Sequence, residues 1–188
     1  MNLITLADFA PYAELSSNIE QKAIDPYILQ AQISDLKPVL GDIFYQDLVV
    51  NFANANYQEL LNGKLYTVPN ANYQAKFEGI KPMLCYWSYA RYVKRASFKP
   101  TMSGMVAKTT QFSEPLSEST LLRLANESMS MAGVYQQGLE MFLYYNRASY
   151  PVIDSVFNLP VSDCRGSIWS IFQRDSSIKS KIRISSTR

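Results

Sequence analysis

Residues 117–146 read SESTLLRLANESMSMAGVYQQGLEMFLYYN and give the clearest structural signal in the sequence. Its first four residues are typical of a helix start, because Ser117 can accept hydrogen bonds from unpaired backbone N–H groups. Apolar and small residues then recur every three or four positions, as on one helix face. That face comprises Leu121, Leu124, Ser128, Met131, Tyr135, Leu139 and Phe142. We therefore expect the longest helix of the chain here, about 45 Å at 1.5 Å per residue.

Two shorter helices are expected near the N-terminus. Residues 24–36 open with Asp25-Pro26, the N-cap and first-position arrangement of a helix start. Their apolar stripe comprises Leu29, Ile33 and Leu36. Lys37-Pro38 should break or reorient this helix, because proline disfavours helical geometry in the preceding residue. After Gly41-Asp42 a second helix is expected, with Phe44, Leu48 and Phe52 four apart, so that the two form a pair joined by a short corner.

The middle of the chain predicts a loop followed by a central helix. Residues 53–72 contain several asparagines, Gly63 and Pro69, which is typical of a loop with one helical turn at 57–61. Apolar spacing of three and four predicts a helix over 73–96, which Pro82 should kink. Its apolar positions are Phe77, Ile80, Leu84, Trp87, Ala90 and Val93. The dense aromatic residues of 85–92 favour core packing over a ligand-stacking or base-stacking platform.

Residues 97–117 differ in character from both neighbouring segments. Pro100, Gly104 and Pro115 surround a run in which apolar and polar residues alternate, which indicates extended chain with a turn near Gly104. We expect an arm or hairpin that contacts another copy rather than its own core. The expected contact residues are Met102, Gly104, Met105, Val106, Lys108 and Phe112.

Helical periodicity is lost after Tyr150-Pro151. We expect a helical domain over 1–150, with the arm at 97–117, and an extended C-terminal docking tail over 151–188. The expected contact residues of the tail are Trp169, Phe172, Ile178, Lys179, Lys181, Ile182, Arg183 and Ile184. The alternation at 178–184 favours strand addition to a partner. The alternative is that the tail folds back on its own bundle and covers apolar surface with Trp169 and Phe172.

The composition is that of a protein with a real core. The chain has 188 residues, of which 47% are hydrophobic and 18% charged, enough for one domain with an appendage. We expect a mainly α fold, a small bundle of about four main helices. No apolar run approaches the roughly 18 residues of a membrane span, and no signal peptide is recognisable, so a soluble protein without membrane contact is expected.

The sequence argues against catalysis. It contains no histidine, which removes the commonest general base, the commonest zinc ligand and every Ser-His or Cys-His pair. Cys85 and Cys164 form neither a CxxC unit nor a disulfide framework, and we expect them reduced, with Cys85 buried. Asp35, Asp42 and Asp47 could lie close together, yet acids at such positions also serve as caps and surface charges. We expect no enzyme, no cofactor and no metal site.

The charge is distributed unevenly. Residues 1–60 carry eight Asp or Glu against two Lys or Arg, whereas residues 165–188 carry six Lys or Arg against one Asp. Complementary ends of this kind suit neighbouring copies that meet end to face. The alternative function that they leave open is a helical nucleic-acid-binding module that uses the basic C-terminus and binds with steep salt dependence.

Several short sequence motifs occur in an order that can be compared with known protein families. They are Ser17-Asn18-Ile19, Ile24-Asp25-Pro26-Tyr27-Ile28, Ala31-Gln32, Asp35-Leu36-Lys37-Pro38-Val39-Leu40-Gly41, Tyr45, Leu48, Ile80-Lys81-Pro82, Tyr86, Gly104-Met105-Val106-Ala107-Lys108, Tyr135, Leu143-Tyr144-Tyr145-Asn146 and Tyr150-Pro151. Together, over residues 8 to about 152, they resemble the head-to-tail connector proteins of tailed phages, also called head-completion or adaptor proteins, in the form found in crAss-like and related Bacteroidetes phages. The likeness is one of structural landmarks and not of reactive groups.

The resemblance implies a structural virion protein. It implies a helical bundle with a protruding arm, assembled as a ring of twelve copies that joins the portal of the capsid to the tail, at the head-tail junction. Genomic DNA would pass through the lumen of this ring without sequence-specific binding. The implied partners are further copies, the portal protein and adjacent tail or ring proteins, with assembly in the host cytoplasm. No catalytic residue is implied, and the tail after Pro151 lies beyond the matching part.

Overall fold

The computed structural model of this protein describes residues 1–15, 18–68, 73–96, 98–101, 104–107 and 116–150, and all structural statements below concern these residues. This part of the chain is mainly α-helical, which confirms the predicted fold class. The helices are α1 (Gln21–Ala31), α2 (Lys37–Leu40), α3 (Asp42–Val50), α4 (Ala55–Asn62), α5 (Lys81–Ala96) and α6 (Glu118–Tyr145), with the short turns η1 (Leu6–Phe9), η2 (Gln32–Leu36) and η3 (Arg147–Ser149). The strands β1 (Lys64–Val68) and β2 (Tyr73–Phe77) form one antiparallel pair, and β3 (Phe98–Thr101) and β4 (Gly104–Ala107) form another.

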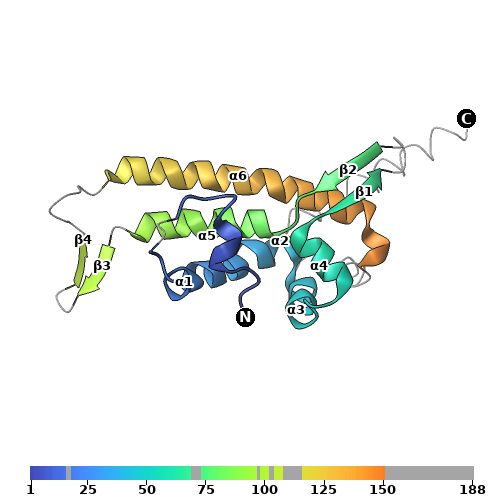
Figure 1. Cartoon of the computed structure of the whole chain (residues 1–188), viewed down its shortest axis with the longest axis horizontal. Coiled ribbons are helices and arrows are strands. Elements are labelled where there is room, and N and C mark those ends of the chain that lie inside the picture. Colours follow the sequence, from blue (N-terminus) through green and yellow to red (C-terminus); the bar gives the residue numbers. More distant parts are fainter. Residues whose placement is uncertain (16–17, 69–72, 97, 102–103, 108–115, 151–188) are drawn as a thin grey trace, which may run out of the picture.

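Three helices form the layers of the body. α5 packs against α6 on one side and against α1 on the other, and Figure 1 shows the three side by side with α5 in the middle. The course of the chain in Figure 1 shows that α1 and α6 run in the same direction and α5 runs in the opposite one. The aromatic stretch of α5 serves this packing, as predicted, because Tyr86 stacks on Tyr135 of α6 and Tyr92 meets Tyr27 of α1 edge-on.

α6 confirms the predicted long helix, including its start. Ser117 accepts a hydrogen bond of 3.3 Å from the backbone N–H of Thr120. The predicted inner face needs one correction, because the side chain of Met131 is exposed. Ala125 and Ala132 are fully buried in its place, and such small residues let α5 approach closely. Alanine gives a weak hydrophobic signal, which is why the sequence pattern favoured the methionine.

The predicted helix start at Asp25-Pro26 is wrong. α1 begins at Gln21, so Pro26 lies inside the helix, where it has no N–H to donate to the carbonyl of Lys22. Both Lys22 and Pro26 are exposed, so water can reach that carbonyl. Asp25 is not a cap, since its carboxylate accepts hydrogen bonds from the side chains of Asn2, at 2.7 Å, and Gln21.

Lys37-Pro38 was expected to break or reorient the helix, but helical structure continues through both residues to Leu40. The π-helical turn η2 widens the chain after α1, and Pro38 then lies in the first turn of α2, where its missing N–H has little cost. The chain turns at Gly41, which has a φ of 83°, and enters α3. The predicted helix pair with a short corner is therefore present, with the corner at Gly41.

The stretch between α4 and α5 differs most from the prediction. Residues 64–68 and 73–77 form the antiparallel β1–β2 pair, called the β1–β2 hairpin below, where a loop and a helix start were predicted. α5 begins only at Lys81, so Pro82 lies in its first turn and not in the helix interior, where it would cause a kink. Gly63 and Gly79 flank the hairpin with φ values of 95° and 92°. A Cβ atom on either glycine would lie 2.4 Å from a backbone carbonyl oxygen of the facing segment. Both positions therefore require glycine.

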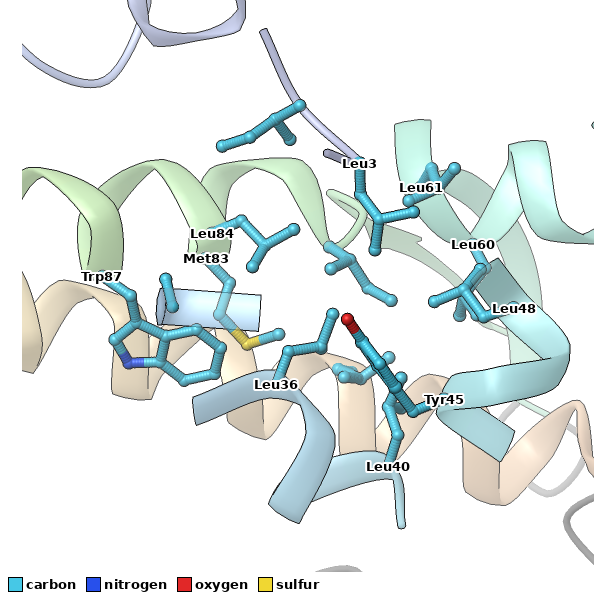
Figure 2. Packing of buried hydrophobic residues seen from close by; sticks show 14 of the residues in the cluster. Leu3, Leu36, Leu40, Tyr45, Leu48, Leu60, Leu61, Met83, Leu84 and Trp87 are labelled. Atoms are coloured by element: carbon cyan, nitrogen blue, oxygen red, sulfur yellow. The ribbon is translucent and has the colours of Figure 1, made fainter. Parts of the chain in front are cut away.

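The hydrophobic core contains residues from the N-terminal segment and from all the longer helices of the described chain. Figure 2 shows its middle, where Leu3 from the N-terminal segment, Leu48 from α3, Leu60 from α4 and Met83 from α5 converge. Gln32 is one of the buried polar residues: it is fully buried and accepts a 2.7 Å hydrogen bond from the backbone N–H of Leu3. This bond fixes the N-terminal segment to the core.

Candidate interaction surfaces

Two ion pairs hold α5 near its two ends. Near the start of the helix, the ammonium of Lys81 binds the carboxylate of Asp8 at 2.9 Å. In its last turns, Arg91 donates to both carboxylate oxygens of Asp35, at 2.8 Å to Oδ1 and 2.6 Å to Oδ2. This bidentate contact with Asp35 of η2 is the main interaction of Arg91. α5 is therefore tied to the N-terminal segment and to η2, and it presents the arm from a fixed base.

The acidic residues considered for a two-carboxylate site each have a structural partner. Asp35 binds Arg91, Asp42 binds Lys37 at 3.1 Å, and Asp47 accepts hydrogen bonds from Asn51, at 2.7 Å, and from Tyr57. Burial and the bond to Asp47 raise the pKa of Tyr57 above its usual range. The contacts of Asp42 and Asp47 connect consecutive helical elements, that of Asp35 connects η2 to α5, and the three carboxylates are in separate interactions.

Cys85 is fully buried, as predicted, and its thiol donates to the carbonyl oxygen of Asp8 at 3.4 Å. Burial raises the pKa of this thiol far above its ordinary value, so at neutral pH it is protonated and is a poor nucleophile. Cys164 lies outside the described residues. Over the described ranges, no group of three or more His, Cys, Asp or Glu residues gathers where a metal ion could bind. In the same part of the chain, no helix is both long and apolar enough to cross a bilayer.

The arm contains the predicted hairpin. The backbones of β3 and β4 pair antiparallel, with Thr101 opposite Gly104 and Phe98 opposite Ala107. Figure 1 shows this pair beyond the end of α5, set apart from the helical layers. Of the predicted contact residues, Gly104, Met105 and Val106 form most of β4. Met102, Lys108 and Phe112 lie outside the described residues.

All predicted contact residues of the tail also lie outside the described residues: Trp169, Phe172, Ile178, Lys179, Lys181, Ile182, Arg183 and Ile184. The point where the tail leaves the body is well defined. Tyr150 is buried, lies 6.0 Å from Phe44 between ring centres, and donates a 2.9 Å hydrogen bond to the carbonyl of Asn56. The 38 residues of 151–188 therefore start from a fixed point beside α3 and α4.

The helix and the arm form a positive stretch of sequence. Residues 79–113 contain six Lys or Arg and no acidic residue. Lys81 and Arg91 are neutralised by Asp8 and Asp35, whereas Lys94 and Arg95 are exposed at the base of the arm. Both lie in the last turn of α5, where positive charge interacts favourably with the helix dipole, which is a sufficient local reason for them. They also place positive charge where the chain leaves the body.

The helical layers expose apolar side chains that sequence reasoning assigned to the core or did not consider. Leu29 and Ile33 were expected to be internal but lie on the outside of α1 and η2. On the outside of α6, Met131, Val134 and Met141 are exposed. A signal was present in the sequence, because both segments carry more apolar residues than one buried stripe requires.

Comparison with known proteins yields one match. The model of the family described as "Family of unknown function (DUF6712)" matches residues 36–155, a range that runs from the end of η2 past the end of α6. No curated protein and no solved structure matches the chain. Because the family model covers more than half of the 188 residues, the chain belongs to the DUF6712 family, whose function is unknown.

Proposed function

We propose that this chain is a structural virion protein, a subunit of the ring that joins the portal of a phage capsid to the tail and lines part of the DNA channel. The observation that carries the proposal is the β3–β4 arm, a two-stranded pair set apart from the helical layers (Figure 1). A two-stranded hairpin is marginal in water unless something packs on it. A neighbouring subunit would supply that packing, as in the connector proteins that the sequence resembles.

The charge of the chain supports a place beside DNA and beside other proteins. Lys94 and Arg95 are exposed in the acid-free stretch 79–113, so phosphates could pass this end of the molecule without repulsion. We propose a ring of twelve copies, located at the head-tail junction, with the portal protein and adjacent tail or ring proteins as further partners. The DNA would be contacted through its backbone and not through its bases.

A binding experiment tests the portal contact. Purified full-length chain is mixed with portal-bearing heads that lack it, and the bound fraction is measured by sedimentation at low and at physiological salt. We expect binding, and we expect truncation after Ser176 to weaken it, most strongly at low salt, while the melting temperature stays unchanged. A truncated protein that melts much earlier but binds heads normally would show that the tail belongs to the core. Absence of binding by the full chain would contradict the proposal.

The alternative, a nucleic-acid-binding module, rests on the six Lys or Arg of residues 165–188. It requires tight binding that falls steeply between two salt concentrations in a filter-binding assay. A ring subunit should retain little free DNA at physiological salt. Tight retention there, without binding to heads, would favour the alternative.

A further inference from the structure

α6 carries a second apolar stripe that its own core does not use. Met131, Val134, Gly138 and Met141 follow one another at spacings of three, four and three, which is typical of a helix face that packs on another helix. The three larger side chains are 43%, 61% and 53% exposed. Residues 128–139 include no charged residue, so another helix could cover this part of the stripe without burying a charge.

Gly138 is a gap in this stripe. A glycine inside a helix is less stable than alanine, so it needs a reason. The part of the chain that the structure describes gives no steric reason, because there a Cβ atom at Gly138 would meet nothing within 4 Å. Glycine at a helix surface does permit the close approach of a side chain from a second helix.

A matching stripe lies on the outside of α1 and η2. Pro26, Leu29 and Ile33 are exposed and uncharged, the last two at 42% and 51%. α5 lies between α1 and α6, so the two helices that carry the stripes are on opposite sides of α5 (Figure 1). A subunit of a ring needs two different faces that fit each other, since such a contact is heterologous and can close on itself.

The two stripes also correspond residue by residue. A charged residue lies four positions before the first residue of each stripe. It is Lys22 for the stripe of α1 and Glu127 for the stripe of α6. The positions Lys22, Pro26, Leu29 and Ile33 have the same spacing as Glu127, Met131, Val134 and Gly138. Among the described residues, Lys22 pairs with Glu20 at 3.2 Å and Glu127 pairs with Arg123 at 3.9 Å, and both partners are exposed. Such pairs contribute little and can exchange partners.

We propose that α6 of one copy packs in parallel on α1 of the next copy, with Glu127 facing Lys22 and Ile33 entering the gap over Gly138. Because α1 and α6 run in the same direction within one copy (Figure 1), a second copy placed alongside brings them together in parallel. Opposite charges fix the register, and apolar side chains supply the contact. This inference rests on the proposed ring and names the surfaces through which its subunits meet.

Cysteine crosslinking tests the contact. In full-length chain with Cys164→Ser, one preparation carries Ile33→Cys and another Gly138→Cys, and the two are mixed under mild oxidation. We expect a covalent dimer in the mixture and in neither preparation alone. The matched control replaces Gly138→Cys by Met129→Cys, an exposed position on another side of α6, and should give no dimer. Equal crosslinking of the control, or no dimer with Gly138→Cys, would overturn the inference.

Sedimentation of the full chain provides a second test. Met131 and Met129 are 43% and 39% exposed on different sides of one helix. Met131→Lys should weaken self-association about tenfold or more, because it buries an unpaired charge, whereas Met129→Lys should leave it unchanged. Glu127→Lys should weaken association, and Lys22→Glu in the same chain should restore it.

The outcomes of these tests separate the contact from the proposed function. Equal effects of the two lysine variants, or a full chain that stays monomeric at its highest soluble concentration, would contradict this contact. Binding to portal-bearing heads is measured independently and would decide the proposed function whatever the contact proves to be.

Discussion

The two β-hairpins of this protein differ in what holds them. β1–β2 packs on the end of α6, where Phe77 stacks on Phe142 with ring centres 4.3 Å apart and Tyr66 meets the same ring edge-on at 5.4 Å. The strands β3 and β4 pair with each other and lie apart from the helical layers (Figure 1). A hairpin that packs on a helix belongs to the core, whereas one that stands apart gains stability from a partner. The first should therefore govern folding and the second assembly.

The largest effect is expected from Phe77→Ala. The side chain of Phe77 is buried between the hairpin and α6, so its removal leaves a cavity and should lower the free energy of unfolding by about 3–5 kcal/mol. Urea unfolding followed by circular dichroism measures this loss. Leu65→Ala in the same hairpin is the control, because Leu65 is exposed and should cost little. A loss for Phe77→Ala as small as that expected for Leu65→Ala would show that the hairpin is not part of the core.

A smaller loss is expected from Gly79→Ala. Alanine is strained at a φ of 92°, and its Cβ would lie 2.4 Å from the carbonyl oxygen of Leu61, so we expect a loss of about 1–3 kcal/mol. Gly133→Ala is the opposite case, since its Cβ meets nothing within 4 Å and α6 gains helix propensity. That variant should be more stable by about 1 kcal/mol. Thermal unfolding of both variants checks the signs, and a neutral Gly79→Ala would contradict the close approach at the hairpin.

A loss of about 1 kcal/mol is expected from Lys81→Met, which removes the ion pair between Asp8 of η1 and the first residue of α5. Partial burial acts to raise the pKa of Asp8, but hydrogen bonds from Lys81 and Thr5 outweigh it, so the pKa lies below 3.8. A depressed pKa stabilises the fold above the unfolded-state value, and this contribution disappears as the pH falls through the folded-state value.

The difference between the native chain and Lys81→Met should therefore be full above pH 3.8 and vanish in stronger acid. Denaturant titrations over this pH range measure it. Lys76→Met is the control, because its pair with Glu78 is exposed and should contribute little at any pH. A difference that persists unchanged in acid would show that Lys81 acts through packing alone.

The smallest effect on folding is expected from deletion of the arm, residues 100–113. Helical circular dichroism and the melting temperature should stay close to those of the native chain, while ring formation is lost. Sedimentation and negative-stain microscopy measure the assembly. Loss of the fold itself would show that the second hairpin, like the first, belongs to the core.

The arm was predictable from the sequence and the β1–β2 hairpin was not. Around Gly104 apolar and polar residues alternate, and no helical spacing of apolar residues overlaps this pattern. In 73–84, by contrast, Phe77, Ile80 and Leu84 lie three and four apart, which mimics one helix face although a turn at Gly79 separates them. Pro82 indicates where α5 begins, because proline is favoured in the first turn of a helix. That preference predicts a helix start next to Pro82 and not at residue 73.

The surfaces were less predictable than the elements. Hydrophobic spacing correctly predicted α6. It could not separate the buried stripe, which includes Ala132, from the exposed stripe, which includes Met131, because both stripes repeat every three or four residues. The same holds for Leu29 and Ile33, which look like core residues in the sequence. The partner of Arg91 was also hidden, because Asp35 is 56 positions away and only the packing of α1 and η2 on α5 brings the two together.

Cryo-electron microscopy of purified virions would show whether this chain forms a ring at the head-tail junction. A ring subunit predicts density for this chain as a closed ring at the distal face of the portal, with each arm lying on a neighbouring copy. A resolved head-tail junction that lacks this chain, or its presence elsewhere in the particle, would contradict the claim.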